Sequence, residues 1–156
     1  MIIREATLLD ADRLRDWRND PFTCAMSRNP SPVGVEEHLE WFRSKLNDPC
    51  CYLGIAEDDM GEPVGTIRLD RSDPNTLDGQ LSWTVAPEFR RRGIGKRMVQ
   101  MMVSRFADHS ILAHIRVDNI PSMKIALSSG MVPTKMEQGF IRFCYQKNIA
   151  VGAASS

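Results

Sequence analysis

The chain has 156 residues, and its 20 lysine and arginine residues balance its 20 aspartate and glutamate residues, which argues against a broad nucleic-acid-binding surface. Hydrophobic residues make up 42% and charged residues 26%, as in ordinary globular domains. No apolar stretch approaches the roughly 20 residues that cross a bilayer, and no secretory leader opens the chain, so we expect a cytoplasmic protein that does not enter a membrane.

In the N-terminal half, alternation of apolar and polar residues predicts strands, and apolar residues three or four positions apart predict helices. Asp10 is placed to cap the first helix. Three prolines interrupt the pattern before the second helix, which predicts a long loop, and such loops are often functional. The predicted elements are a strand at 2–6, a helix carrying Leu14 and Trp17, a loop at 19–34, a helix at 35–46, and strands at 51–57 and 63–70.

The C-terminal half continues with strands separated by helices. An apolar stripe from Ile94 through Met101 to Phe106 predicts a helix with one core-facing side. Asn119 and Gly130 are placed to cap and to end a second helix. The predicted elements are a strand at 80–85, a helix from 94 to about 109, a strand at 111–117, a helix between Asn119 and Gly130, and strands at 134–137 and 140–146.

The order of these elements predicts an α/β (α+β) fold. Strands in runs, together with strands separated by helices, indicate a mixed, mostly antiparallel central sheet of about seven strands flanked by about four helices. We expect a single domain at 1–147 and a C-terminal tail at 148–156. The assembly state stays open, with a homodimer as one option.

The cysteines and histidines do not predict a metal site. The four cysteines contain no C-x-x-C pair, and the three histidines are not spaced as zinc ligands. We therefore expect reduced structural cysteines and no metal.

The most informative segment is a strand, a short loop and a helix that starts at Arg90-Arg91-Arg92-Gly93-Ile94-Gly95. Glycines let a backbone approach a ligand closely, and the first N–H groups of a helix, with its dipole, favour a phosphate. The cations from Arg90 to Arg97 either add contacts to such a ligand or belong to a solvated turn. The pattern is neither a P-loop nor a dinucleotide fingerprint. On these residues alone, a phosphate site and a plain glycine-rich helix start both remain open.

Two blocks of the sequence resemble the GNAT acyltransferase superfamily. The stretch VAPEFRRRGIGKRMVQMMV at 85–103 is similar to that family's coenzyme-binding motif, Arg/Gln-x-x-Gly-x-Gly/Ala after a strand. The stretch RVDNIPSMKIALSSGMV at 116–132 is similar to its next strand-helix unit. The resemblance covers about residues 1–147 and implies an acetyl-CoA-dependent N-acetyltransferase in which an amine attacks the thioester directly.

The resemblance also implies roles for individual residues. Val85 would hydrogen-bond the pantetheine arm through its backbone, and Asn119, with Ser122 nearby, would bond the same arm. Asn119 could equally be a helix cap alone, and the two roles are compatible. The pyrophosphate would be held mostly through backbone N–H groups by Arg90, Arg91, Arg92, Gly93, Ile94, Gly95 and Lys96.

Two positions depart from the family pattern. Gln80 stands where many relatives have a glutamate base, and Ala126 where many have a tyrosine that protonates the thiolate. The catalytic residues therefore stay unassigned, with Asp78, His38 and Ser128 as candidates. A water chain that removes the amine proton is the preferred interpretation, and loss of catalysis is another.

The N-terminal half is expected to select the acceptor, and it resembles the amino-sugar-nucleotide and ribosomal-protein branches of the family. Its candidate contacts are Trp17, Arg28, His38 and Trp41, although both tryptophans could simply pack under the helices. The first hypothesis is N-acetylation of a small-molecule amine, with a nucleotide-linked amino sugar as first choice. The alternatives are acetylation of a protein N-terminus and a noncatalytic acyl-CoA-binding module.

Overall fold

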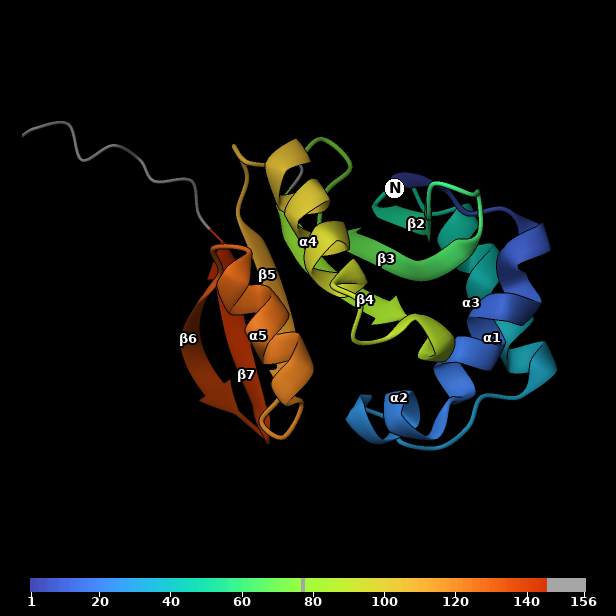
Figure 1. Ribbon diagram of the computed structural model, residues 1–156. Coiled ribbons are helices and arrows are strands. Elements are labelled where there is room, and N and C mark those ends of the chain that lie inside the picture. The colour runs from blue at the N-terminus through green and yellow to red at the C-terminus, as the bar shows by residue number, and fades with distance from the viewer. Residues whose placement is uncertain (77, 146–156) are drawn as a thin grey trace, which may run out of the picture.

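A computed structural model describes residues 1–76 and 78–145. In this part of the chain, seven strands form one sheet and five α-helices pack around it (Figure 1), which confirms the predicted fold class. None of these helices is long and apolar enough to cross a membrane. The elements are β1 (Ile2–Glu5), the short 3-10 helix η1 (Leu8–Asp10), α1 (Ala11–Asn19), α2 (Pro21–Met26), α3 (Val35–Leu46), β2 (Cys51–Glu57), β3 (Pro63–Arg71), β4 (Gly79–Val85), the 3-10 helix η2 (Pro87–Phe89), α4 (Ile94–Arg105), β5 (Ile111–Arg116), α5 (Ile120–Ser128), β6 (Val132–Glu137) and β7 (Phe140–Tyr145).

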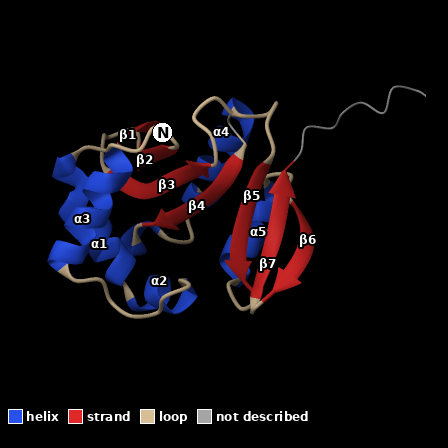
Figure 2. Cartoon of the chain, turned by 180° about the vertical axis from the view of Figure 1, so that it is seen from behind, coloured by secondary structure: helices blue, strands red, loops and turns tan. Residues whose placement is uncertain are grey.

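The sheet has the strand order β1-β2-β3-β4-β5-β7-β6. Neighbouring strands run antiparallel except β4 and β5, which run parallel. Among the described residues, this parallel pairing joins only Gly79 with Ile111 and Gln80 with Leu112. Beyond these pairs the two strands diverge, so the sheet opens into two arms, as both views show (Figures 1 and 2).

Apolar residues on opposite faces of the central strands form two core clusters. Because side chains alternate along a strand, Ile55 of β2 packs with Trp17 and Phe42 on the side of α1 and α3. Its neighbour Ala56 joins the larger cluster, which includes Met98 of α4. In Figure 1, α4 and α5 lie together over one face of the two arms, so the start of α4 is fixed beside the opening between β4 and β5.

The structure corrects the predicted loop at 19–34, because this segment contains α2. Asp20 caps that helix by accepting a hydrogen bond from the N–H of Thr23 on Oδ2 at 3.1 Å. Pro21 occupies the first turn, where its missing N–H costs nothing. The proline that predicted a loop therefore starts a helix instead.

The predicted end of α4 is wrong, and one residue of its predicted apolar stripe lies off the buried face. The helix α4 ends at Arg105 rather than near residue 109. Its buried face is centred on Met98 and Met102, and Met101 is 38% exposed because each residue turns the helix by about 100°. Residues 146–156, which include the predicted tail and the end of the last strand, lie outside the described residues.

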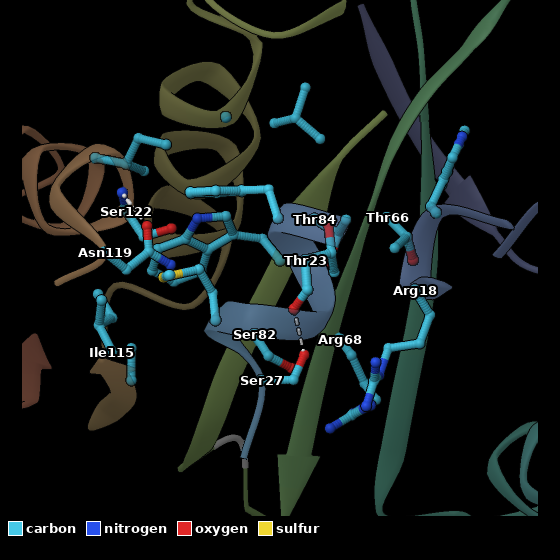
Figure 3. Close-up of a pocket in the computed structure, with 18 of the residues that line it drawn as sticks. Arg18, Thr23, Ser27, Thr66, Arg68, Ser82, Thr84, Ile115, Asn119 and Ser122 are labelled. Carbon is cyan, nitrogen blue, oxygen red and sulfur yellow. Dashed lines mark hydrogen bonds between the residues drawn. The ribbon is translucent and has the colours of Figure 1, made fainter. Parts of the chain in front are cut away.

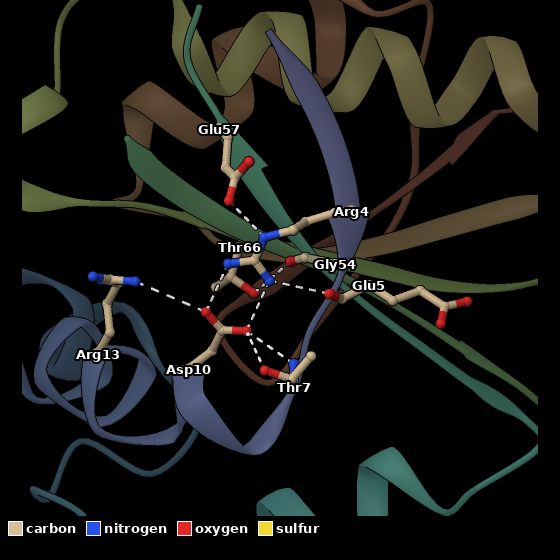
Figure 4. A network of polar contacts seen from close by, with 8 residues as sticks. All are labelled: Arg4, Glu5, Thr7, Asp10, Arg13, Gly54, Glu57 and Thr66. Atoms are coloured by element: carbon tan, nitrogen blue, oxygen red, sulfur yellow. Dashed lines mark hydrogen bonds and ion pairs between the residues drawn. The ribbon is translucent and has the colours of Figure 1, made fainter. Parts of the chain in front are cut away.

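A partly buried ion pair joins the N-terminal strand to the start of α1 (Figure 4). Arg4 donates two hydrogen bonds of 2.9 Å to the carboxylate of Asp10 and a third, of 2.5 Å, to Glu57. The N–H of Thr7 donates to the same carboxylate at 2.8 Å. Asp10 was predicted to cap α1, and it does hold the capping position, but its side chain makes no capping hydrogen bond. These contacts lower the pKa of Asp10, with the Arg4 hydrogen bond as the largest cause.

We predict that Asp10→Asn lowers the free energy of unfolding at pH 7 by about 1–3 kcal/mol, because Arg4 loses one of its two ionic partners in a partly buried setting. The pKa of Asp10 is lower in the folded chain than in the unfolded one. Its contribution is therefore fully present above the unfolded pKa of about 4 and is lost as pH falls through the folded value. Urea unfolding between pH 7 and pH 2.5 tests this, with exposed Asp16→Asn as the control. An Asp10→Asn deficit that stays constant down to pH 2.5 would contradict it.

Candidate functional site

A cleft of about 1150 Å³ fills the opening between the two arms of the sheet. One wall comes from β3, β4 and the start of α4, and the other from β5, α5 and Phe140 of β7. The helices α1, α2 and α3 close one end. Figure 3 shows labelled side chains from both arms pointing into this space, among them Ser82 and Thr84 of β4, Ser122 of α5 and Asn119, which precedes α5.

The start of α4 presents free backbone N–H groups to the cleft. Gly93 is the N-cap residue and has a φ of 75°, which glycine adopts without strain. The first helical hydrogen bond runs from the N–H of Arg97 to the carbonyl of Gly93 at 3.1 Å. The N–H groups of Ile94, Gly95 and Lys96 therefore have no partner within the helix. All three residues line the cleft, so a ligand there meets unpaired donors and the positive end of the helix dipole.

The two glycines of the loop serve different purposes. A Cβ atom on Gly93 would meet nothing within 4 Å, so this position lies open to a ligand. A Cβ atom on Gly95 would lie 2.6 Å from Cδ1 of Ile125 and 3.2 Å from Cγ2 of Val85. Gly95 thus lets α4 pack closely against α5 and β4, a role that the sequence pattern alone did not indicate.

The structure divides the cationic run into two groups. The guanidinium of Arg90 is 2.6 Å from Oδ2 of Asp20 and donates to Thr23 at 3.0 Å, so its side chain holds α2 rather than a ligand. Burial by itself would raise the pKa of Asp20, but the Arg90 hydrogen bond and others lower it overall. Arg92 donates to the carbonyl of Glu88 at 3.2 Å and is not among the residues that line the cleft.

Arg91 and Lys96 are the remaining cations of this run in the cleft wall. Both are exposed, and Arg91 has a φ of 65°, unusual for a residue with a side chain. Two left-handed residues, Arg91 and Gly93, therefore bend the loop around the helix start. Successive N–H groups in such turns form anion-binding concavities.

The opposite wall begins at the cap of α5. The side-chain oxygen of Asn119 accepts a hydrogen bond from the N–H of Ser122 at 3.2 Å, so the predicted cap is confirmed. Both residues line the cleft, as does Val85 across the opening. Because β4 and β5 no longer pair at this level, the backbone of Val85 has no strand partner on the cleft side.

The predicted acceptor residues all line the cleft, at the end closed by the helices. Trp17 is only 5% exposed and belongs mainly to the core. Trp41 is covered by the guanidinium of Arg68, whose central carbon lies 5.2 Å from the ring centre. Arg28 lies 4.4 Å from the ring centre of Phe140, so the segment after α2 reaches the far arm. His38 is buried, and its Nε2 is 2.8 Å from the carbonyl of Ala11.

Two of the candidate catalytic residues do not reach the cleft. Asp78 lies at the closed end of the β4–β5 pair, where it accepts a hydrogen bond of 2.6 Å from the N–H of Ser110. The hydroxyl of Ser128 donates to the carbonyl of Ile125 at 3.0 Å. Neither lines the cleft. The third candidate, His38, does line the cleft. Its pKa is lowered, mainly by burial, which makes it a weaker base.

The lining of the cleft carries more cations than carboxylates, although Arg68, Arg90 and Arg116 each pair with an aspartate. Arg18 and Arg68 converge in Figure 3. The sequence pattern did not single out either residue, but the position of Arg18 directly after Trp17 was a signal that could have pointed to it. Glu37 is the one carboxylate among the residues that line the cleft in the described part of the chain. The cations that line it are Arg18, Arg28, Arg68, Arg90, Arg91, Lys96 and Arg116. Three or more His, Cys, Asp or Glu side chains do not gather into a metal-binding group anywhere in residues 1–76 and 78–145.

Comparison with known proteins connects this geometry to a family. A family model for the acetyltransferase (GNAT) domain matches residues 1–132. No curated protein matches the chain.

Several solved structures share the fold at low sequence identity. The spermidine N-acetyltransferase from Vibrio cholerae, in complex with CoA and spermine, has a TM-score of 0.81 at 15% identity, over 94% of this chain and 95% of that one. A domain from Methanocaldococcus jannaschii has a TM-score of 0.77 at 22% identity, over 92% and 96%. The aminoglycoside acetyltransferase AAC(6′)-Ib, in complex with coenzyme A, has a TM-score of 0.77 at 16% identity, over 94% of each chain.

We predict that Gly95→Ala destabilises the protein by about 1–3 kcal/mol, because the added methyl group overpacks the contact with Ile125 and Val85. Gly34→Ala is the matched control, since a Cβ atom there meets nothing within 4 Å. Urea unfolding of both variants and the wild type measures the difference. Equal stability of the two variants would contradict the packing role of Gly95.

Proposed function

Because the chain belongs to the GNAT acetyltransferase family, we propose that its cleft joins acetyl-CoA to a small amine that carries negative charge, with a nucleotide-linked amino sugar as first choice. The chain is an N-acetyltransferase that uses acetyl-CoA as co-substrate. The cleft would hold the coenzyme at the start of α4 and the acceptor at the end closed by the helices.

The opening between β4 and β5 is the observation that supports the proposal most strongly. It exposes the backbone of β4 at Val85 and ends at the free N–H groups of α4. An extended pantetheine arm fits along such an unpaired strand edge, and a diphosphate fits the helix start. Gly93 leaves room for this approach, and Arg91 and Lys96 would add charge-assisted contacts.

The remaining loop residues support this site indirectly. Arg90 is expected to hold the loop in place through Asp20, and Gly95 through close packing of α4 on α5. Asn119 and Ser122 lie on the facing wall, where a polar contact with the pantetheine arm is compatible with the cap of α5. Correct positioning of the two substrates and the exclusion of water would then supply much of the catalysis.

The charge of the cleft favours an anionic acceptor. Spermine and aminoglycosides, which appear in the names of the similar structures, are polycations, and a basic cleft repels them. Arg18 donates to Asn29 and Cys24, neither of them a carboxylate. Arg68 shares the carboxylate of Asp70 with Lys45. An amine that carries phosphate or carboxylate groups would neutralise this excess charge.

We predict that saturating acetyl-CoA raises the melting temperature of the wild type by several degrees, since a ligand at about 100 times its Kd adds roughly 2.7 kcal/mol. Gly93→Trp should abolish this shift by blocking the approach to the helix start. Gly93→Ala is the matched control, because it has the same backbone strain of about 1–2 kcal/mol without the bulk. An undiminished shift in Gly93→Trp would refute the placement.

We predict that a UDP-linked amino sugar is acetylated at least tenfold more efficiently than spermidine or an N-terminal peptide, as measured by free thiol release. Arg68→Gln should raise the KM for the nucleotide sugar about tenfold or more, equivalent to roughly 1.4 kcal/mol, and leave the KM for acetyl-CoA unchanged. Arg43→Gln, at an exposed position on α3, is the control. Preference for spermidine would contradict the anionic acceptor, and binding of acetyl-CoA without any transfer would favour a noncatalytic module.

A further inference from the structure

Two buried polar atoms of the described residues lack a hydrogen-bond partner, and both belong to residues that line the cleft. They are Nε1 of Trp83 and Nδ1 of His114. Trp83 lies on β4 and His114 on β5, the two strands that diverge. Buried polar atoms in folded proteins nearly always have partners. Both nitrogens are covered by protein atoms, so neither is itself a contact for a ligand; they mark Trp83 and His114 as polar side chains at the opening whose hydrogen bonding the protein leaves incomplete.

His114 lies on the cleft face of β5. Its neighbours Ala113 and Ile115 are 1% and 5% exposed and belong to the core, so the alternation along the strand turns His114 to the opposite face. His114 lies two positions after Leu112, the last residue of β5 that pairs with β4. Arg142 of β7 stands opposite it in register.

Few groups in the cleft can accept a proton. Among the described residues that line it, the carboxylates and imidazoles are Glu37, His38 and His114. Glu37 is exposed in the first turn of α3. His38 lies on α3 as well, and one of its ring nitrogens contacts the carbonyl of Ala11. His114 alone of the three lies on a strand at the opening, where the thioester and the amine would meet.

We propose that His114 accepts the proton that the acceptor ammonium must lose before it attacks the thioester. This proposal rests on the proposed function. Burial, followed by the charges of Arg28 and Arg142, lowers the pKa of His114, and Glu137 opposes this shift. A lowered pKa favours the neutral form of the imidazole at pH 7, and the neutral ring can accept a proton.

The step balances without another reactant. One ammonium proton passes to the imidazole of His114 and from there to solvent. The amine nitrogen then forms a bond to the acetyl carbon, and the bond from that carbon to sulfur breaks. The second amine proton leaves the nitrogen and ends on the sulfur, so the products are the amide, the free thiol and one released proton.

The kinetic test compares His114→Gln with the wild type, using the UDP-linked amino sugar as acceptor. His114→Gln should lower kcat about 100-fold or more at pH 7 and leave the KM for acetyl-CoA unchanged. The deficit should shrink as pH rises toward the pKa of the amine, because the free amine then needs no base. His109→Gln, outside the cleft, is the matched control. A deficit independent of pH, or none, would overturn the proposal.

A second test needs no acceptor. The imidazole ¹⁵N and ¹H signals of His114, identified by their loss in His114→Gln, are followed from pH 4.5 to 8.5 with and without coenzyme A. The proposal predicts an imidazole that is neutral at pH 7 in both states and signals that move when coenzyme A binds. An imidazolium at pH 7 would overturn the role of His114 even if acetyl transfer occurs. If coenzyme A fails to bind at all, the proposed function fails instead.

Discussion

The parallel pairing of β4 with β5 stops after Gln80 and Leu112, and the rest of the molecule is arranged around that interruption. A continuous sheet would satisfy these backbone groups internally and leave no room for a ligand. Here the larger core cluster contains residues of both arms and holds them together, and the second cluster packs α1 and α3 onto the first arm. The unpaired strand edge, the free start of α4 and the cap of α5 consequently face one space.

Several contacts keep that space open and shaped. Arg90 and Asp20 tie the glycine-rich loop to α2, although the two residues are 70 positions apart. Gly95 brings α4 within contact distance of Ile125. Arg28 connects the segment after α2 to Phe140 on the far arm. The glycine-rich loop, where we propose that the coenzyme binds, is thus mechanically linked to the helices at the proposed acceptor end, which favours correct relative placement of the two substrates.

Much of this could be predicted from the sequence, where local patterns decide the outcome. Strand alternation, the stripe along α4 and the Asn119 cap are local signals, and the structure confirms them. The role of Gly95, the partner of Arg90 and the unpaired nitrogen of His114 depend on contacts between distant segments, so no local pattern reveals them. The sequence does not reveal α2, because the prolines of this segment are typical of a loop, whereas Pro21 lies in the first turn, where a proline is compatible with a helix.

In the proposed placement, the coenzyme meets the backbone at the start of α4 and along the unpaired edge of β4. An amide ¹H–¹⁵N NMR titration with acetyl-CoA observes that backbone directly. The largest shifts are predicted on Gly93, Ile94, Gly95 and Lys96 and along residues 83–85, with smaller shifts at the α5 cap. Saturable shifts confined to other parts of the chain, with these amides unmoved, would contradict the placement of the coenzyme.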